Sequence, residues 1–269
     1  DHRGRGYPRQ PGVYVKLKAL IFDVDGTLAD TEEAHRCAFN EAFREHGLDW
    51  NWSRPKYAHL LRTAGGKERI GAYIDSLPLE PAQRRALRVR VADIHAAKTR
   101  LFNDMIRAGK VPLRDGVERL MDEAAAAGVE LAIASTTTLA NIETLLHTTL
   151  GSQSLQRFAA IGAGDQVSHK KPAPDIYQFV LRALRRSADE CAAIEDSRNG
   201  LLAAKGAGLY TVVTPSYWTR DEDFSAADLV LPSLGSPARP LPRRVAVLVG
   251  REVLGVREID GQIGIKEYQ

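Results

Sequence analysis

The sequence predicts an open, doubly wound α/β sheet of parallel strands, with a small α-helical domain inserted after the first strand. Three observations support this prediction. Short, nearly continuous apolar runs recur along the chain, helical patterns separate most of them, and one long helical stretch follows the first run. Apolar runs of this kind suit strands that are covered on both faces, as they are in a parallel sheet.

Five segments are predicted to form the strands of this sheet. They are residues 18–22 (KALIF), 130–134 (ELAIA), 158–162 (FAAIG), 191–195 (CAAIE) and 210–214 (YTVVT). Helical patterns lie between them at residues 116–128, 174–186 and 198–208. Strands that alternate with helices of this length form parallel crossovers, so the order along the chain indicates a doubly wound sheet.

Residues 30–105 interrupt this alternation with several helical patterns and no convincing strand. Asp30 can cap the first helix, with Glu33 at the third helical position, and Phe39 and Phe43 then share one face. Because the insertion follows the first strand directly, we expect it to lie above the carboxyl end of that strand. Open α/β sheets bind their ligands at that edge.

The two ends of the chain differ in composition from the middle. Residues 1–16 are rich in Gly, Pro and Arg and lack an apolar signal segment, so we expect a poorly ordered extension rather than a secretory signal. Residues 235–269 are predicted to be a Pro-rich linker, GSPARPLPRR, and a tail of unknown role. The pattern around Asp260 and Gly261 favours a β-hairpin if the tail folds.

Neither a membrane nor a nucleic-acid partner is expected from the composition, and the basic charge balance gives little support for a nucleic-acid partner. No apolar run approaches the roughly 18 residues that span a bilayer. The formal net charge of +3 arises at the ends of the chain, because residues 19–234 alone carry a net charge of −3. Cys37 and Cys191 are predicted to be reduced thiols in a cytoplasmic protein, which we expect to be a monomer.

Two aspartates follow the first predicted strand. Asp23 and Asp25 stand at positions i and i+2, so their carboxylates share one face near the carboxyl edge of the sheet. Gly26 and Thr27 then allow the chain to turn. Paired carboxylates indicate either a Mg²⁺ site or a nucleophile beside a general acid.

Three further segments bring polar side chains to the same edge. Ser135 follows the second predicted strand, Lys171 precedes a predicted helix, and Glu195 and Asp196 end the fourth strand. The edge then offers a nucleophile, an acid, a hydroxyl group, a cation and carboxylates for a metal ion. Phosphoryl transfer needs such a set, because positioning and charge neutralisation supply most of its catalysis.

The motifs DVDGT, IAS, KKPAPD and IEDSRNG, in this order, resemble the four signatures of the haloacid dehalogenase (HAD) superfamily. The resemblance covers residues 17–234 and implies a Rossmann-like core at 17–29 and 106–234 with a helical cap at 30–105. Within the superfamily the chain is similar to the CbbY group, through DGTLADTEEAHRCAFNEAF, TAGGKERI, IHAAKT and EDSRNGLLAAKGAGL. That group removes the 1-phosphate of xylulose 1,5-bisphosphate in carbon-fixing organisms.

The resemblance implies a role for each residue at the sheet edge. Asp23 is expected to attack phosphorus and become an aspartyl phosphate, and Asp25 to protonate the departing sugar oxygen and then activate water. Ser135 and Lys171 are expected to hold the phosphoryl oxygens.

The resemblance also implies a magnesium ion as cofactor. The expected ligands are the carboxylate of Asp23, the backbone carbonyl of Asp25 and the carboxylate of Asp196. Glu195 is expected to lie nearby or to coordinate the ion through water.

In the cap, the resemblance places substrate contacts at six positions. They are Glu32, Tyr57, Gly65, Gly66, Lys67 and Arg69. Lys67 and Arg69 suit the second phosphate of a bisphosphate, which needs a cationic receptor.

Several of these assignments have structural alternatives. Ser135 could simply end a strand, Glu195 could be structural, and Tyr57 could be a packing aromatic. Lys67 and Arg69 could be solvated charges.

Two other functions compete with a phosphatase. A β-phosphoglucomutase-like mutase would share Asp23, Asp25 and His35, but such mutases carry a Lys-Asn pair where this chain has Thr138 and Leu139. A non-catalytic scaffold is disfavoured because every catalytic residue type is present. Dehalogenase chemistry is disfavoured because dehalogenases lack a counterpart of Asp25.

Overall fold

The computed structural model describes residues 17–263, with the exception of residues 64 and 165. The extension expected at residues 1–16 lies outside the described residues. The strands are β1 (Ala19–Phe22), β2 (Glu130–Ala134), β3 (Phe158–Gly162), β4 (Cys191–Glu195), β5 (Tyr210–Val213) and β6 (Leu229–Val230). They form one parallel sheet in the order β3-β2-β1-β4-β5-β6, which confirms the predicted fold class. The five predicted strands are all present, and the short β6 was not predicted.

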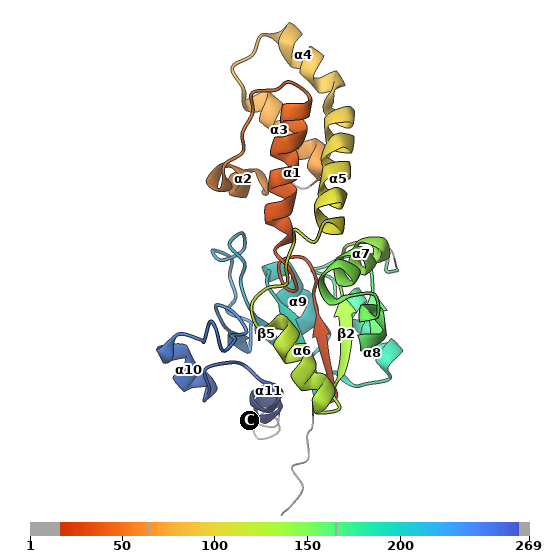
Figure 1. Cartoon of the computed structure of the whole chain (residues 1–269), viewed down its shortest axis with the longest axis vertical. Coiled ribbons are helices and arrows are strands. Elements are labelled where there is room, and N and C mark those ends of the chain that lie inside the picture. The colour runs from red at the N-terminus through yellow and green to blue at the C-terminus, as the bar shows by residue number, and fades with distance from the viewer. Residues whose placement is uncertain (1–16, 64, 165, 264–269) are drawn as a thin grey trace, which may run out of the picture.

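Helices cover both faces of the sheet and build the cap above it (Figure 1). The cap helices are α1 (Thr31–Glu45), α2 (Arg54–Leu60), α3 (Gly66–Ser76), α4 (Pro81–Val89) and α5 (Val91–Arg107). The remaining α-helices are α6 (Val117–Ala126), α7 (Leu139–Leu150), α8 (Asp175–Leu184), α9 (Arg198–Gly206), α10 (Arg243–Val249) and α11 (Val256–Ile263). Two short 3₁₀ helices are η1 (Ser154–Arg157) and η2 (Ala188–Glu190).

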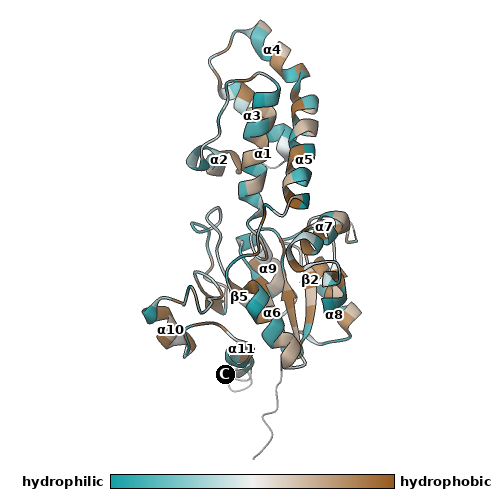
Figure 2. Ribbon diagram, in the orientation of Figure 1, coloured by the Kyte–Doolittle hydropathy of each residue, from teal (hydrophilic) through white to brown (hydrophobic). Residues whose placement is uncertain are grey.

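The central strand explains why the apolar runs are continuous. In β1, Leu20 and Phe22 join a core with residues of α6 and α7, whereas Ala19 and Ile21 join a second core with residues of α8 and α9. Both faces of the strand are therefore buried, and Figure 2 shows hydrophobic residues concentrated in the strands. Because β2 and β4 flank β1 in parallel, the residues that follow these three strands meet at one edge.

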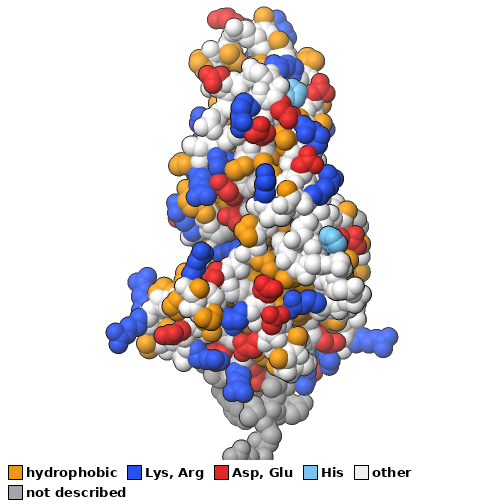
Figure 3. Space-filling view, in the orientation of Figure 1, with side chains coloured by type: hydrophobic (Ala, Val, Ile, Leu, Met, Phe, Trp, Pro, Cys, Tyr) orange, Lys and Arg blue, Asp and Glu red, His pale blue; other side chains and the backbone are white. Residues whose placement is uncertain are grey.

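The cap has an aromatic core of its own. As predicted, its first helix follows Asp30, whose carboxylate accepts the backbone N–H of Glu33 at 3.4 Å, and it ends shortly before Gly47. The buried cluster comprises Phe39, Ala42, Phe43, Trp52, Tyr57, Leu60, Ile70, Ile74 and Ile94. On the face shown in Figure 3, basic and acidic side chains are interspersed over the cap, so this surface is of mixed sign.

The predicted hairpin at Asp260 and Gly261 is wrong, because both residues lie inside α11. Val256, Ile259 and Ile263 recur at helical spacing and are buried in the core that contains α6. The Asp-Gly pair indicates a turn only locally. Burial of the apolar face against the core favours the helix. Among the described residues, none of the helices combines the length and apolar character that crossing a membrane requires.

The segment predicted as a linker also packs against the core. Leu241 is 4% exposed and its backbone N–H donates to the carbonyl of Glu252 at 2.7 Å. The guanidinium of Arg119, on α6, donates to the carbonyls of Leu234, Gly235 and Leu254. Leu241, Leu254 and the buried face of α11 therefore extend the packing of the core, whereas Val247 of α10 is exposed.

Ile259→Ala tests this continuation of the core. Because the side chain is 1% exposed, we expect the substitution to lower the free energy of unfolding by about 2–4 kcal/mol. Val247→Ala, at a position that is 75% exposed on α10, is the control and should change it by less than about 0.5 kcal/mol. Chemical denaturation measures both, and equal small effects would contradict the packing of α11.

Candidate active site

The chain turns sharply where β1 ends. Asp23 follows the strand, and its backbone N–H donates to the carbonyl of Ile194 at 3.0 Å. Gly26 has a φ of 85°, which favours glycine. A Cβ atom at Gly26 would also overlap the carboxylate of Asp196. Glycine at this position therefore lets the turn of β1 approach the end of β4.

Three buried carboxylates meet at this edge. Asp23, Glu195 and Asp196 are 7%, 0% and 4% exposed, and each offers a ligand atom within 4.8 Å of the others. Burial, together with the charges of Asp23 and Glu195, raises the pKa of Asp196 well above its ordinary value. Burial also raises the pKa of Glu195, to about 7. Burial and mutual repulsion therefore disfavour the ionised carboxylates, and a bound cation would stabilise them.

Lys171 supplies one positive charge to this cluster. Its Nζ lies 2.7 Å from Oδ1 of Asp23, 2.6 Å from Oε1 of Glu195 and 2.9 Å from the carbonyl oxygen of Ala134. Burial alone would lower the pKa of Lys171, but the two carboxylates outweigh it and raise this pKa. The Tyr177 hydroxyl donates to the same oxygen of Glu195 at 2.5 Å. The exposed Lys170 takes no part.

Asp25 lies beside this cluster in a different environment. The Thr31 hydroxyl donates to its Oδ1 at 2.7 Å. Burial, and then the charge of Asp23, raise the pKa of Asp25 to about 6. A carboxyl group with a pKa near neutrality can both donate and accept a proton, as acid–base catalysis requires.

Ser135 follows β2 at the same edge. It is 1% exposed, and its hydroxyl oxygen accepts the backbone N–H of Thr137 at 3.2 Å. The neighbouring Thr136, which the sequence analysis did not select, lines the cavity over Asp23 and Lys171. The turn after β2 therefore brings hydroxyl and backbone groups toward the carboxylates.

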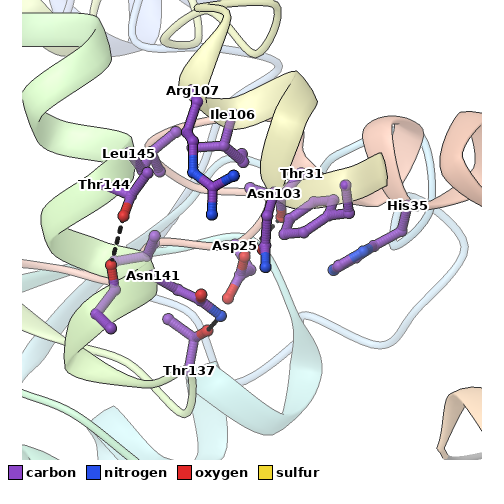
Figure 4. Close-up of a pocket in the computed structure, with 13 residues that line it drawn as sticks. Asp25, Thr31, His35, Asn103, Ile106, Arg107, Thr137, Asn141, Thr144 and Leu145 are labelled. Carbon is purple, nitrogen blue, oxygen red and sulfur yellow. Dashed lines mark hydrogen bonds between the residues drawn. The ribbon is translucent and has the colours of Figure 1, made fainter. Parts of the chain in front are cut away.

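A cavity of about 300 Å³ opens above the carboxylates between core and cap. Its lining includes Asp23, Asp25, Glu32, Leu61, Thr136, Lys171, Asp196 and Trp218. A second cavity of about 200 Å³ shares Asp25 and Thr31 and lies between α5 and α7. Figure 4 shows Asn103 and Arg107 of α5 and Asn141 and Thr144 of α7 around it. Asp25 thus borders both cavities.

Three of the six predicted cap residues form one chain of contacts. The Tyr57 hydroxyl donates to Oε1 of Glu32 at 2.5 Å and accepts from the Arg69 guanidinium at 3.1 Å. Arg69 also donates to the backbone carbonyl of Leu60 at 3.2 Å. Because Glu32 lines the larger cavity, this chain links the aromatic core of the cap to the space above Asp23.

The other three predicted cap residues lie at the start of α3. Gly65 precedes the helix with a φ of 87°, and a Cβ atom at Gly66 would overlap the ring of His95. Lys67 is exposed and does not line either cavity described above. Both glycines thus have backbone or packing reasons to be glycine, in addition to the predicted substrate contact.

The sequence analysis missed Lys98, a buried cation in the cap. Lys98 is only 8% exposed. Its Nζ lies 2.9 Å from Nδ1 of His35 and near the rings of Phe39 and Phe102. Burial lowers the pKa of Lys98 to about 8. Burial and the charge of Lys98 hold the pKa of His35 well below its usual value, so this histidine is neutral.

A signal for Lys98 was present in the sequence. On α5 it stands four residues after Ile94 and four before Phe102, so a lysine occupies the apolar stripe of the helix. A charge at such a position is costly to bury and indicates a functional role.

Comparisons with known proteins agree with this geometry. Residues 17–208 match the family of haloacid dehalogenase-like hydrolases. The chain is 51% identical over 229 residues to the plasmid-encoded protein CbbY of Cupriavidus necator, which covers 85% of this chain and 90% of the relative. A crystal structure of CbbY from Rhodobacter sphaeroides in complex with phosphate is 47% identical, with a TM-score of 0.67 over 81% of this chain and 94% of that one.

A second crystal structure, of a CbbY mutant from Rhodobacter sphaeroides, is in complex with xylulose-(1,5)bisphosphate. It is also 47% identical, with a TM-score of 0.67, and covers 82% of this chain and 98% of that one. The chain therefore belongs to the haloacid dehalogenase-like hydrolase family, and within it to the CbbY proteins.

Proposed function

We propose that the chain is a Mg²⁺-dependent phosphatase that converts xylulose 1,5-bisphosphate to xylulose 5-phosphate and phosphate. One observation carries this proposal. Lys171 holds the carboxylate of Asp23 at 2.7 Å beside Asp25, in a chain 47% identical to a protein crystallised with that bisphosphate. A buried carboxylate oriented by a cation, next to a carboxyl group of raised pKa, suits nucleophilic catalysis with acid–base assistance.

The first step transfers the phosphoryl group to the protein. A carboxylate oxygen of Asp23 attacks phosphorus, and the bond from phosphorus to the sugar oxygen breaks. Asp25 gives its proton to that oxygen, which its pKa of about 6 supports. Lys171, Ser135 and Thr136 are proposed to hold the phosphoryl oxygens, since Lys171 and Thr136 line the cavity and Ser135 precedes Thr136.

The second step releases phosphate. Asp25, now a carboxylate, takes a proton from water as the water oxygen attacks the phosphorus of the aspartyl phosphate. The bond from phosphorus to Asp23 breaks and restores the nucleophile. One carboxyl group thus serves as acid and then as base.

The residues at the edge fit a magnesium ion. Asp23 and Asp196, together with the backbone carbonyl of Asp25, would hold it, because oxygen ligands suit Mg²⁺ and the buried carboxylates carry excess negative charge. Glu195 already accepts hydrogen bonds from Lys171 and Tyr177, so we assign it to the support of Lys171. When bound, the ion would neutralise charge on the phosphoryl group.

The cap is proposed to receive the distal phosphate. Arg69 and Lys98 lie on the side of the cap that bears Glu32, and Lys67 stands at the start of α3. Lys98 has a neutral histidine rather than a carboxylate at hydrogen-bond distance, so its charge is available to an anion. Gly65 and Gly66 would allow the substrate to approach the backbone closely.

A mutase remains the alternative that product analysis must exclude. At the start of α7, Thr138 caps the helix and Leu139 is 37% exposed, where the mutases carry a phosphate-gripping pair. This supports hydrolysis over transfer back to the sugar.

We also propose a cytoplasmic monomer. Cys37 and Cys191 are free, which supports a reducing compartment.

Asp23→Asn, with the wild type beside it, tests the reaction. We expect the wild type with Mg²⁺ to release one phosphate per xylulose 1,5-bisphosphate and leave the 5-phosphate, as phosphate assay and mass spectrometry can measure. The variant keeps the shape of Asp23 but lacks the attacking charge, so turnover should fall at least about a thousandfold. Turnover within about tenfold, or isomerisation of a hexose 1-phosphate that needs a bisphosphate primer, would contradict the proposal.

Arg69→Ala tests the cap as a receptor for the distal phosphate. A charge-assisted contact is worth roughly 1.5–3 kcal/mol, so kcat/KM on the bisphosphate should fall about tenfold to a hundredfold. The loss on para-nitrophenyl phosphate should be slight, because that substrate leaves the distal position empty. Arg88→Ala, in a surface ion pair with Asp75, is the matched control. Equal losses on both substrates for Arg69→Ala would refute this role.

Lys98→Met should make the protein more stable and less active. The pKa of Lys98 is about 8 in the folded state against 10.5 as its ordinary value, so the cost of burying the charge is fully present below about pH 8. We expect the variant to gain about 1–3 kcal/mol of unfolding free energy at pH 7. This gain should shrink as pH rises from 8 toward 10.5, because the wild type then loses the proton.

The same variant should lose about tenfold or more in kcat/KM on the bisphosphate. Lys56→Met, on the exposed surface of α2, is the control for both measurements. Lower stability of Lys98→Met at pH 7, or unchanged activity, would contradict the assignment of Lys98 as an anion receptor.

A further inference from the structure

The segment between β5 and β6 connects the carboxylate cluster to the cap. It leaves the carboxyl end of β5 and passes beside the base of the cap, below α2 (Figure 1). None of its residues was selected from the sequence. Its side chains contact Asp196 in the turn after β4 at one end and cap residues at the other. It therefore joins two parts of the proposed site that come from different domains.

At the core end, this segment contacts the turns that follow β1 and β4. The Thr219 hydroxyl lies 2.7 Å from the backbone oxygen of Asp196 and 3.3 Å from its Oδ2. The guanidinium of Arg114 donates to the carbonyls of Thr214 and Pro215, at 2.7 and 3.0 Å, and also to that of Gly26. The segment is therefore tied to both loops that carry carboxylates.

The upper contacts are made by Trp218. Its Nε1–H donates to Oδ1 of Asp30 at 3.0 Å, and Asp30 is the residue that caps α1. The indole ring meets the ring of Tyr57 at an angle of 88°, with 5.4 Å between centroids. Trp218 also lines the cavity that contains Asp23 and Lys171.

Tyr57 is the residue through which Trp218 can influence the site. Its hydroxyl bridges Glu32, at 2.5 Å, and Arg69, at 3.1 Å. Burial, and then the charge of Glu32, raise the pKa of Tyr57, so the hydroxyl remains a hydrogen-bond donor. A ring that packs against Tyr57 therefore fixes the direction of this bridge.

We infer that Trp218 is a positioning residue that sets substrate preference by holding Tyr57, and through it Glu32 and Arg69, against the cavity. The inference rests on the proposed function, in which the cap receives the distal end of a bisphosphate. An aromatic contact between core and cap orders the bridge only when both domains enclose the cavity. A substrate that reaches the cap benefits from that order, whereas a small monophosphate does not.

Trp218→Ala and Trp218→Phe, assayed with Mg²⁺ on xylulose 1,5-bisphosphate and on para-nitrophenyl phosphate, test the inference. Loss of one aromatic contact should lower kcat/KM on the bisphosphate about three- to tenfold in Trp218→Ala, mainly through a higher KM. The change on para-nitrophenyl phosphate should stay within about twofold. Trp218→Phe keeps a ring beside Tyr57 and should recover most of the loss. Equal losses on both substrates would overturn the inference.

Phe224→Ala is the matched control, because Phe224 is a partly buried aromatic residue of the same segment, and the ring contacts of Trp218 and Tyr57 in the described part of the chain do not include it. It should leave both activities unchanged. A loss equal to that of Trp218→Ala would assign the effect to the segment as a whole and overturn the role of Trp218.

A measurement without substrate separates this inference from the proposed function. In ¹⁵N-labelled protein, the indole N–H signal of Trp218 is identified by its absence in Trp218→Phe. Tyr57→Phe removes the hydroxyl that bridges Glu32 and Arg69, and we expect it to shift this signal. An unmoved signal would overturn the inference. Failure of the wild type to hydrolyse the bisphosphate, with the signal shifted, would reject the proposed function alone.

Discussion

The burial of three carboxylates at the end of a parallel sheet is the constraint on which the rest of the site depends. Asp23, Glu195 and Asp196 would repel one another strongly, and Lys171 offsets this repulsion from within hydrogen-bond distance of two of them. One lysine does not balance three carboxylates, so the site retains negative charge that a metal ion can neutralise. Burial, and then the charge of Asp23, raise the pKa of Asp25 to about 6, where one carboxyl group could serve both proposed proton transfers.

The interior of the cap is apolar and buries a cation, in contrast to the carboxylate cluster. This interior is aromatic, and Lys98, which is buried there, has His35 rather than a carboxylate at hydrogen-bond distance among the described residues. A buried cation in the cap would suit the distal phosphate of the proposed bisphosphate substrate. Trp218 joins these two regions, since the adjacent Thr219 bonds to Asp196 of the core while Trp218 itself contacts Asp30 and Tyr57 of the cap. The buried charges of the core and of the cap lower the stability of the fold, and we attribute their presence to binding and chemistry in the cavity.

The fold and the carboxylate edge could be predicted because their signals are local. Strands buried on both faces read as continuous apolar runs, and the residues that follow parallel strands must meet at one edge. The predicted hairpin is wrong because it relied on the turn preference of Asp260 and Gly261, whereas burial of Ile259 against the core stabilises a helix there. Trp218 could not be foreseen, because its contacts with Asp30 and Tyr57 span more than 150 residues of sequence.

The thermal stability of Asp196→Asn, with and without Mg²⁺, tests the electrostatic account most directly. Without Mg²⁺, removing one of three repelling carboxylates should leave the variant at least as stable as the wild type, because burial and the neighbouring charges raise the pKa of Asp196. Addition of Mg²⁺ should raise the Tm of the wild type and leave that of the variant unchanged. An unchanged Tm of the wild type on addition of Mg²⁺, or an equal rise in the Tm of the variant, would contradict the account.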